Sequence, residues 1–137
     1  MFTKEERSTF KYWFAHWCAF QLVALNLRAW KLKYLLHDFE KPWLRLWYRG
    51  DYSKVQAWHR GHRKHHLGYP GKKDYIEMVI DWECSRFTKL SSPESAYQYF
   101  YNKKGFTLPE EDFIGIKKAL IYLGLSDGKN EVKLENV

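Results

Sequence analysis

Histidine and aspartate are the residues of this chain whose types and spacing point most directly to chemistry. All six histidines belong to one pattern, which a later aspartate completes. The pattern consists of His16, His37, Asp38, His59, His62, His65, His66 and Asp81. Histidine is the commonest metal ligand in proteins, and imidazole nitrogen with carboxylate oxygen suits a hydrolytic first-row metal. The order therefore predicts a metal-centred active site with one or two divalent transition metals, chosen from Mn, Fe, Co, Ni or Zn.

Length and composition fit a single folded domain. A chain of 137 residues has the usual size of one domain and buries roughly two-thirds of its unfolded surface on folding. Aromatic residues make up 19% of the chain, which is more than disordered chains carry and enough to build a core. The net charge of +7 favours anionic partners such as nucleotides or nucleic acid, or it simply keeps the protein in solution.

Neither a secretory segment nor a membrane span is expected. The chain begins MFTKEERSTF, which lacks the apolar core of a signal peptide. The apolar stretch from 12 to 27 is short for a bilayer span and contains His16 and Gln21, so we expect a buried helix there. Two cysteines, Cys18 and Cys84, do not make a disulfide framework. We therefore expect a cytoplasmic protein with no membrane partner.

Helical periodicity and capping residues dominate the sequence, and strand patterns are lacking. The expected helices span about 4–30, 32–39, 53–66, 74–89, 92–100 and 107–124, with a short helical piece at about 43–48. Their expected caps are Ser53, Asp74 with Glu77, Ser92 before Pro93, Thr107 with Glu110, and Gly124. These signals predict an all-α fold, a compact single-domain bundle of five to six helices over 1–125. A polar tail is expected at 126–137.

Four of the histidines lie within the expected helix at 53–66. Because an α-helix turns about 100° per residue, all four would occupy roughly one third of its circumference. His62 and His66, four residues apart, have the spacing that lets two side chains bind one ion. The alternative is an exposed basic face, since three cations lie among the histidines. We favour a shared face of metal ligands.

The position of Asp81 allows two interpretations. On a helical wheel, the helix expected at 74–89 has its apolar residues on one side, and Asp81 lies on the other with Asp74 and Glu77. Periodicity alone therefore favours an aspartate that faces solvent. A cleft that binds a metal is itself polar, so the same position also suits a ligand, and the order of the other motifs favours that interpretation.

The ligand order resembles that of the HD-domain superfamily of metal-dependent phosphohydrolases. Its signature is one histidine, then a His-Asp dipeptide, then a distant aspartate, on a bundle of helices, and the matching residues here are His16, His37, Asp38 and Asp81. A closer likeness is to a small family of phage and bacterial proteins with an HD-like core. Its motifs correspond to LLHD at 35–38 followed by Lys41, HRKHH at 62–66 and EMVIDW at 77–82. The likeness covers about residues 12 to 123, and for a phage protein it implies the cytoplasm of a bacterial host.

The resemblance implies an HD-domain-like fold and a metal-activated water. The expected function is a phosphohydrolase acting on an anionic small molecule, a nucleotide or related phosphate ester. The superfamily order implies that His16, His37, Asp38 and Asp81 hold a first metal. Asp38 would bridge to a second metal held by His62 and by one or more of His59, His65 and His66. The expected catalytic residues are Asp38, Lys41 and His62.

Five cations are candidates to bind the substrate phosphate, because guanidinium and ammonium groups pair with phosphate oxygens. They are Lys41, Arg45, Arg60, Arg63 and Lys64. For each one the alternative is a solvated surface charge, and Lys41 is favoured because it repeats the spacing of the family that the chain resembles.

Two other function classes stay open at this stage. Relatives of the same superfamily use this ligand order for oxygen chemistry, which allows a di-iron oxygenase. A non-enzymatic basic module is the third class, since basic and aromatic residues together bind nucleic acid or a host protein. For a phage protein, the third class includes interference with a bacterial defence.

Overall fold

The structure is a computed structural model that describes residues 2–3, 5–88, 95–104 and 107–126. The described residues form six α-helices and no β-strand, so the all-α prediction is confirmed. The α-helices are α1 (Phe10–Asn26), α2 (Lys41–Trp47), α3 (Tyr52–His62), α4 (Tyr75–Ser85), α5 (Ala96–Tyr99) and α6 (Glu110–Tyr122). Short 3-10 helices cover Glu5–Ser8 and Leu32–Leu36, and a π-helical turn covers Phe100–Lys104.

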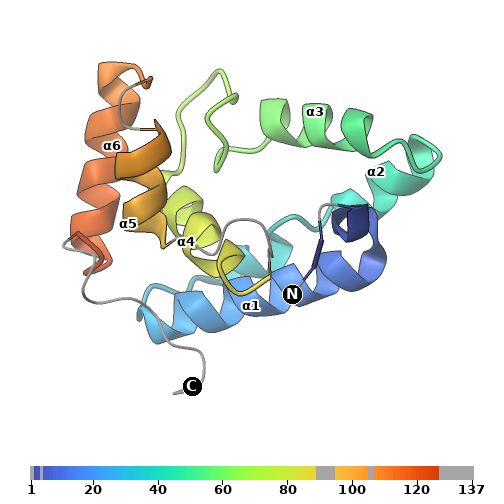
Figure 1. Ribbon diagram of the computed structural model, residues 1–137, viewed down its shortest axis with the longest axis horizontal. Helices are drawn as coiled ribbons and strands as arrows, with labels where there is room; N and C mark the ends of the chain where they lie inside the picture. Colours follow the sequence, from blue (N-terminus) through green and yellow to red (C-terminus); the bar gives the residue numbers. More distant parts are fainter. Residues whose placement is uncertain (1, 4, 89–94, 105–106, 127–137) are drawn as a thin grey trace.

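The fold is compact, and three of its helices pack around α4 (Figure 1). Helix α4 packs on α1 along one side and on α5 and α6 along another, while α2 packs on α3 at the opposite end of the molecule. Helix α3 lies across from α1, and a long loop at 63–74 connects it to α4. The loop thus returns the chain from the α2–α3 end to the centre of the bundle.

The core is built on the apolar side of α4. Met78, Val79 and Ile80 are fully buried, and they belong to one cluster with Phe20 of α1 and Ile116 of α6. Burying a side chain of this size stabilises the fold by about 1.5–3 kcal/mol. Because α4 is clamped between α1 and α6, the orientation of its polar side, which carries Glu77 and Asp81, is fixed as well.

Several of the expected helices are shorter than the periodicity predicted. Helix α1 begins at Phe10 because the hydroxyl of Thr9 caps it, accepting a hydrogen bond from the backbone N–H of Tyr12 at 3.2 Å. It ends at Asn26, and Arg28 adopts a positive φ of 57°, which no helix continues through. The helix expected at about 32–39 is only a 3-10 helix that ends at Leu36.

The caps were predicted with mixed success. The Asp74 side chain accepts from the backbone N–H of Glu77 at 3.0 Å, as expected. Helix α3 is capped by Asp51 instead of Ser53, and it ends at His62 instead of about residue 66. Helix α6 begins after Pro109, so Thr107 stands too early in the chain to cap it. Gly124 follows α6 with a positive φ of 74°, the conformation expected of a glycine at a helix end.

Some expectations fall on parts of the chain that are not described. The predicted cap at Ser92 and Pro93 lies outside the described residues, as does the expected tail apart from Ser126. Across the part of the chain that the structure covers, no helix is long and apolar enough to cross a membrane.

The contact between α4 and α6 depends on a glycine. A Cβ atom added at Gly115 would lie 2.3 Å from the ring of Tyr75, whose hydroxyl donates a 2.7 Å hydrogen bond to Asp112. We predict that Gly115→Ala lowers the free energy of unfolding by about 1–3 kcal/mol, because the ring must move away from its partner. Urea unfolding with a chelator present measures this loss.

Gly61→Ala is the matched control, since a Cβ at Gly61 of α3 meets no atom within 4 Å. It should leave stability unchanged or raise it by about 0.5–1 kcal/mol. Equal destabilisation by the two substitutions would contradict the packing argument.

Candidate metal centre

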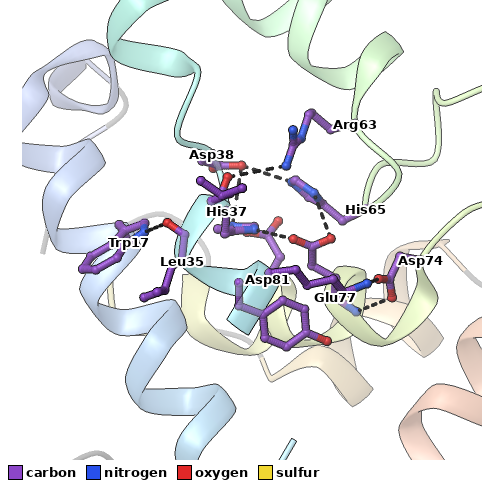
Figure 2. A network of polar contacts seen from close by, with 12 residues as sticks. Trp17, Leu35, His37, Asp38, Arg63, His65, Asp74, Glu77 and Asp81 are labelled. Atoms are coloured by element: carbon purple, nitrogen blue, oxygen red, sulfur yellow. Dashed lines mark hydrogen bonds and ion pairs between the residues drawn. The ribbon is translucent and has the colours of Figure 1, made fainter. Parts of the chain in front are cut away.

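The His37-Asp38 dipeptide forms a sharp turn that is fastened to α1. Asp38 has a positive φ of 54°, an uncommon conformation that aspartate tolerates better than most residues. The indole N–H of Trp13 donates to the carbonyl of Asp38 at 2.6 Å, and the indole N–H of Trp17 donates to the carbonyl of Leu35 at 3.0 Å. These bonds hold the turn so that both side chains of the dipeptide point into the bundle (Figure 2).

The first group of candidate ligands joins α1, the turn and α4. It consists of His16, His37, Asp38 and Asp81, whose ligand atoms all lie within 4.8 Å of one another. Oδ1 of Asp81 lies 2.8 Å from Nε2 of His16 and 3.1 Å from Nε2 of His37. An ion with bonds of 2.0–2.1 Å separates tetrahedral ligands by roughly 3.3 Å, so small shifts would admit one. Two imidazoles and two carboxylates thus converge on one buried point.

The second group joins the same aspartate to α3 and to the loop after it. It consists of Asp38, His59, His65 and His66. Oδ1 of Asp38 lies 2.9 Å from Nε2 of His59 and 3.1 Å from Nε2 of His65. Within the described structure, the buried Nε2 atoms of His59 and His66 have no hydrogen-bond partner of proper geometry. Buried ring nitrogens are normally satisfied, and a cation between these atoms would satisfy both.

Two glutamates stand behind the histidines. Glu77 places Oε1 3.2 Å from Nδ1 of His37 and Oε2 3.6 Å from Nδ1 of His65, so it lies between the two rings (Figure 2). Glu40 contacts Nδ1 of His59 in the same way. A carboxylate on the far nitrogen of a metal-binding histidine fixes the ring and makes it a stronger ligand. Glu77 and Glu40 therefore position histidines of both groups, a role that the sequence did not predict for them.

Burial and pairing together set the charges of the centre. Burial alone would raise the pKa of Asp38, but the charges of His37 and Lys41 hold it well below its usual value. Burial likewise opposes ionisation of Asp81, and hydrogen bonds from His16 and His37 lower its pKa well below the usual value. Both carboxylates are therefore ionised and available as ligands at neutral pH.

The histidines of the loop have opposite charge states in the absence of metal. Burial opposes protonation of His65, yet its contacts with Asp38 and Glu77 raise its pKa to about 10. Burial and the neighbouring charge of His65 lower the pKa of His66 to about 2. His65 thus carries a proton at neutral pH that a metal ion would have to displace, whereas His66 is already neutral.

His62 is the one predicted ligand that the structure does not bring to either group. It is exposed, its ring stacks on Trp58 with centroids 4.2 Å apart, and its Nδ1 donates to the carbonyl of Trp58 at 2.7 Å. The shared helix face was the wrong basis for the prediction, because α3 ends at His62 and Arg63 is extended. His65 and His66 reach the centre from the loop instead.

The predicted phosphate-binding cations lie in different places. Lys41 and Arg45 line a cavity of about 570 Å³ beside the first group, and Nζ of Lys41 is 3.0 Å from Oδ2 of Asp38. Arg60 lines a smaller polar cavity of about 80 Å³ that also touches ligands of both groups. Arg63 contacts Glu40 and the carbonyl of Leu36, and Lys64 lies in a separate groove.

Two further cations line the larger cavity and were not predicted. Arg7 precedes α1 and Arg49 follows α2, and their side chains face the same space as Lys41 and Arg45. No sequence motif marks them, since only folding brings the two segments together. The cavity therefore has four cationic side chains in its lining, which suits an anionic occupant.

Comparison of the chain with protein-family models, with curated proteins and with solved structures found no significant match. Inferences about the function of the site therefore rest on its geometry. Buried histidine and carboxylate groups in this fold can hold a metal ion.

The first test concerns metal content. Because Asp38 belongs to both groups, we predict that Asp38→Ala holds less than about one-tenth of an ion per chain after reconstitution with manganese, iron or zinc. The unchanged protein should retain one or two. His66→Ala should remove only the ion of the second group, and His62→Ala should remove none. Elemental analysis after gel filtration measures the metal content per chain of all four proteins. An unchanged protein that holds no metal after reconstitution would contradict the prediction that the site binds metal.

The second test concerns the proton on His65. Its pKa of about 10 lies above neutrality, so we predict release of about one proton for each ion bound to the second group at about pH 7.5. Metal affinity should accordingly rise as the pH approaches 10 and fall as the pH drops. Calorimetric titration in two buffers of different ionisation enthalpy counts the protons. His62→Gln should release the same number, and a count of zero would show that His65 is not a ligand.

Proposed function

We propose that this protein is a metal-dependent phosphohydrolase that acts on a nucleotide or related phosphate ester. The observation that carries the proposal is the position of Asp38. One buried carboxylate belongs to both ligand groups, at the edge of a cavity lined by cations. Neighbouring metal ions about 3.5–4 Å apart with a shared ligand are the usual device of enzymes that displace an oxygen at phosphorus.

The residues divide the work between binding ions and binding substrate. Divalent ions held by the two groups would supply an activated water and polarise the phosphoryl oxygens. Asp38 places Oδ1 toward His59 and His65, and Oδ2 toward Lys41. Burial disfavours a charged Lys41, but the charge of Asp38 raises its pKa, so Lys41 stays a cation that can bind a phosphate oxygen beside the metal ligands.

The cavity beside the first group has the composition of a site for an aromatic phosphate ester. Its cations are Arg7, Lys41, Arg45 and Arg49, and its walls include Trp13 and Trp43. Arginine binds phosphate oxygens through two parallel N–H groups, and indole faces stack on planar rings. A volume of about 570 Å³ lies within the range of sites that enclose small molecules. A nucleotide satisfies all three properties, which is why we favour that substrate class.

The likeness of the ligand order to the HD superfamily supports the same reaction class and is itself part of the proposal. The residues that match the order of the superfamily signature also lie together in space, and they are His16, His37, Asp38 and Asp81. We extend the proposal to an HD-like arrangement of helices. His62 has no part in it, because its side chain stacks on Trp58 away from both groups.

A phosphate-release screen tests the proposal. Metal-reconstituted protein should hydrolyse at least one member of a panel of nucleoside mono-, di- and triphosphates and cyclic nucleotides. Asp38→Ala should lose at least about a thousandfold in kcat/KM, since both metals depend on it. Arg45→Ala should mainly raise KM, because Arg45 touches the cavity but not the ligand groups.

His62→Ala is the control that should keep full activity. A metal-loaded protein that is inactive on the whole panel would contradict the nucleotide proposal. Mixed-valent iron signals with oxygen uptake would replace it by a di-iron oxygenase.

A further inference from the structure

A second basic site lies outside the two cavities at the metal centre. It is a groove of about 820 Å³, which we call the lysine groove. Six lysines line it, and they are Lys31, Lys33, Lys64, Lys72, Lys73 and Lys118. Among the described residues, the groove has no lining residue in common with the two cavities at the metal centre. Its cations are thus separate from those of the proposed substrate site.

Four segments of the chain build the lysine groove. Lys31 and Lys33 come from the 3-10 helix after α1 and the residue before it, and Lys64, Lys72 and Lys73 come from the loop before α4. Helix α6 contributes Lys118 and the exposed ring of Tyr122, and the start of α4 contributes Tyr75. Gly115 lets the ring of Tyr75 lie directly on α6. The groove is therefore a product of the fold and not of one basic stretch of sequence.

Most of the charge in the lysine groove is uncompensated. Lys33 pairs with Asp74 at 2.5 Å, and Lys73 pairs with Asp112 at 3.2 Å. In the part of the chain that the structure describes, no carboxylate lies within ion-pair distance of the other four, Lys31, Lys64, Lys72 and Lys118. Mutual repulsion of four exposed cations costs stability, and an anionic ligand would relieve it.

We infer that the lysine groove binds single-stranded nucleic acid. Lysine offers a flexible point charge, which suits a chain of phosphates that need no fixed geometry, whereas bidentate recognition of one phosphate uses arginine. Every cation that lines the groove, among the described residues, is a lysine. Tyr122 is 68% exposed at its edge and gives an unpaired base a ring to stack on. A positive groove with an exposed aromatic ring is the usual design of such sites.

Binding of a fluorescent oligonucleotide tests the inference. We use single-stranded RNA and DNA of roughly twelve nucleotides, within the usual site size, and record fluorescence anisotropy at several salt concentrations. The logarithm of affinity should fall linearly with the logarithm of salt concentration, with a slope of about 0.7 per phosphate bound. Lys64→Ala/Lys72→Ala/Lys118→Ala should weaken binding at least about tenfold at low salt and reduce the slope by about 2.

The matched control removes the same charge elsewhere. Lys11→Ala/Lys54→Ala/Lys117→Ala replaces three exposed lysines that do not line the groove, one of them next to Lys118 in sequence, and it should bind nearly as well as the unchanged protein. Tyr122→Ala should lose about tenfold and Tyr122→Phe much less, because the ring stacks and the hydroxyl is not needed.

Binding of either RNA or DNA supports the inference, since both present the same phosphates and unpaired bases. Equal losses in the two triple variants would overturn it, because net charge alone would then explain binding. Tighter binding of a duplex than of single strands would also overturn it, as would tripolyphosphate that binds as tightly as the oligonucleotide.

Discussion

The buried carboxylate of Asp38 is the constraint on which the rest of the structure depends. Its side chain is 2% exposed, and an isolated charge in such a place is very unfavourable. Three side-chain nitrogens lie 2.9 to 3.1 Å from its carboxylate oxygens, and they come from different parts of the chain: Lys41, His59 and His65. Removing one member of such an arrangement costs about 3–5 kcal/mol, because the others remain buried and unpaired. The helices must therefore meet at this point if the domain is to fold as it does.

Helix α4 shows how the same residues support both packing and chemistry. Its apolar side is fixed between α1 and α6. Its other side carries Glu77 and Asp81, which are four residues apart. Asp81 faces His16 and His37, and Glu77 lies beside the far nitrogens of His37 and His65. The rings of His16, His37 and His65 are thus positioned by the core packing of a single helix, which helps ligands from five segments of the chain to converge.

Helical periodicity predicted the helical class, because it is a local signal. The residues of the first ligand group were expected from the resemblance of the ligand order to the HD signature, and the structure confirms only that they lie together in space. The sequence did not predict how the second group forms. The wheel argument assumed that one helix runs through residue 66, whereas the chain leaves the helix at Arg63 and presents His65 and His66 from a loop. A helical wheel of the helix expected at 74–89 favoured a solvent-facing Asp81, yet its side chain is only 13% exposed, because the turn at His37 covers that side of α4. Tertiary contacts alone bring three further residues to the site, and no spacing in the sequence predicts them. They are Glu40, Arg7 and Arg49.

The loop between α3 and α4 has a consequence that reaches beyond the metal centre. The backbone N–H of Asp74 donates to the carbonyl of Lys64 at 2.8 Å, which closes the loop on itself. His65 and His66 face the buried ligands, while Lys64 and Lys72 face the lysine groove. Ions on one side and an anion on the other would restrain the same segment of backbone. If the first ligand orders the loop, the second loses less conformational entropy on binding. Occupancy of the two faces would then be thermodynamically coupled, and by linkage the coupling would be equal in both directions.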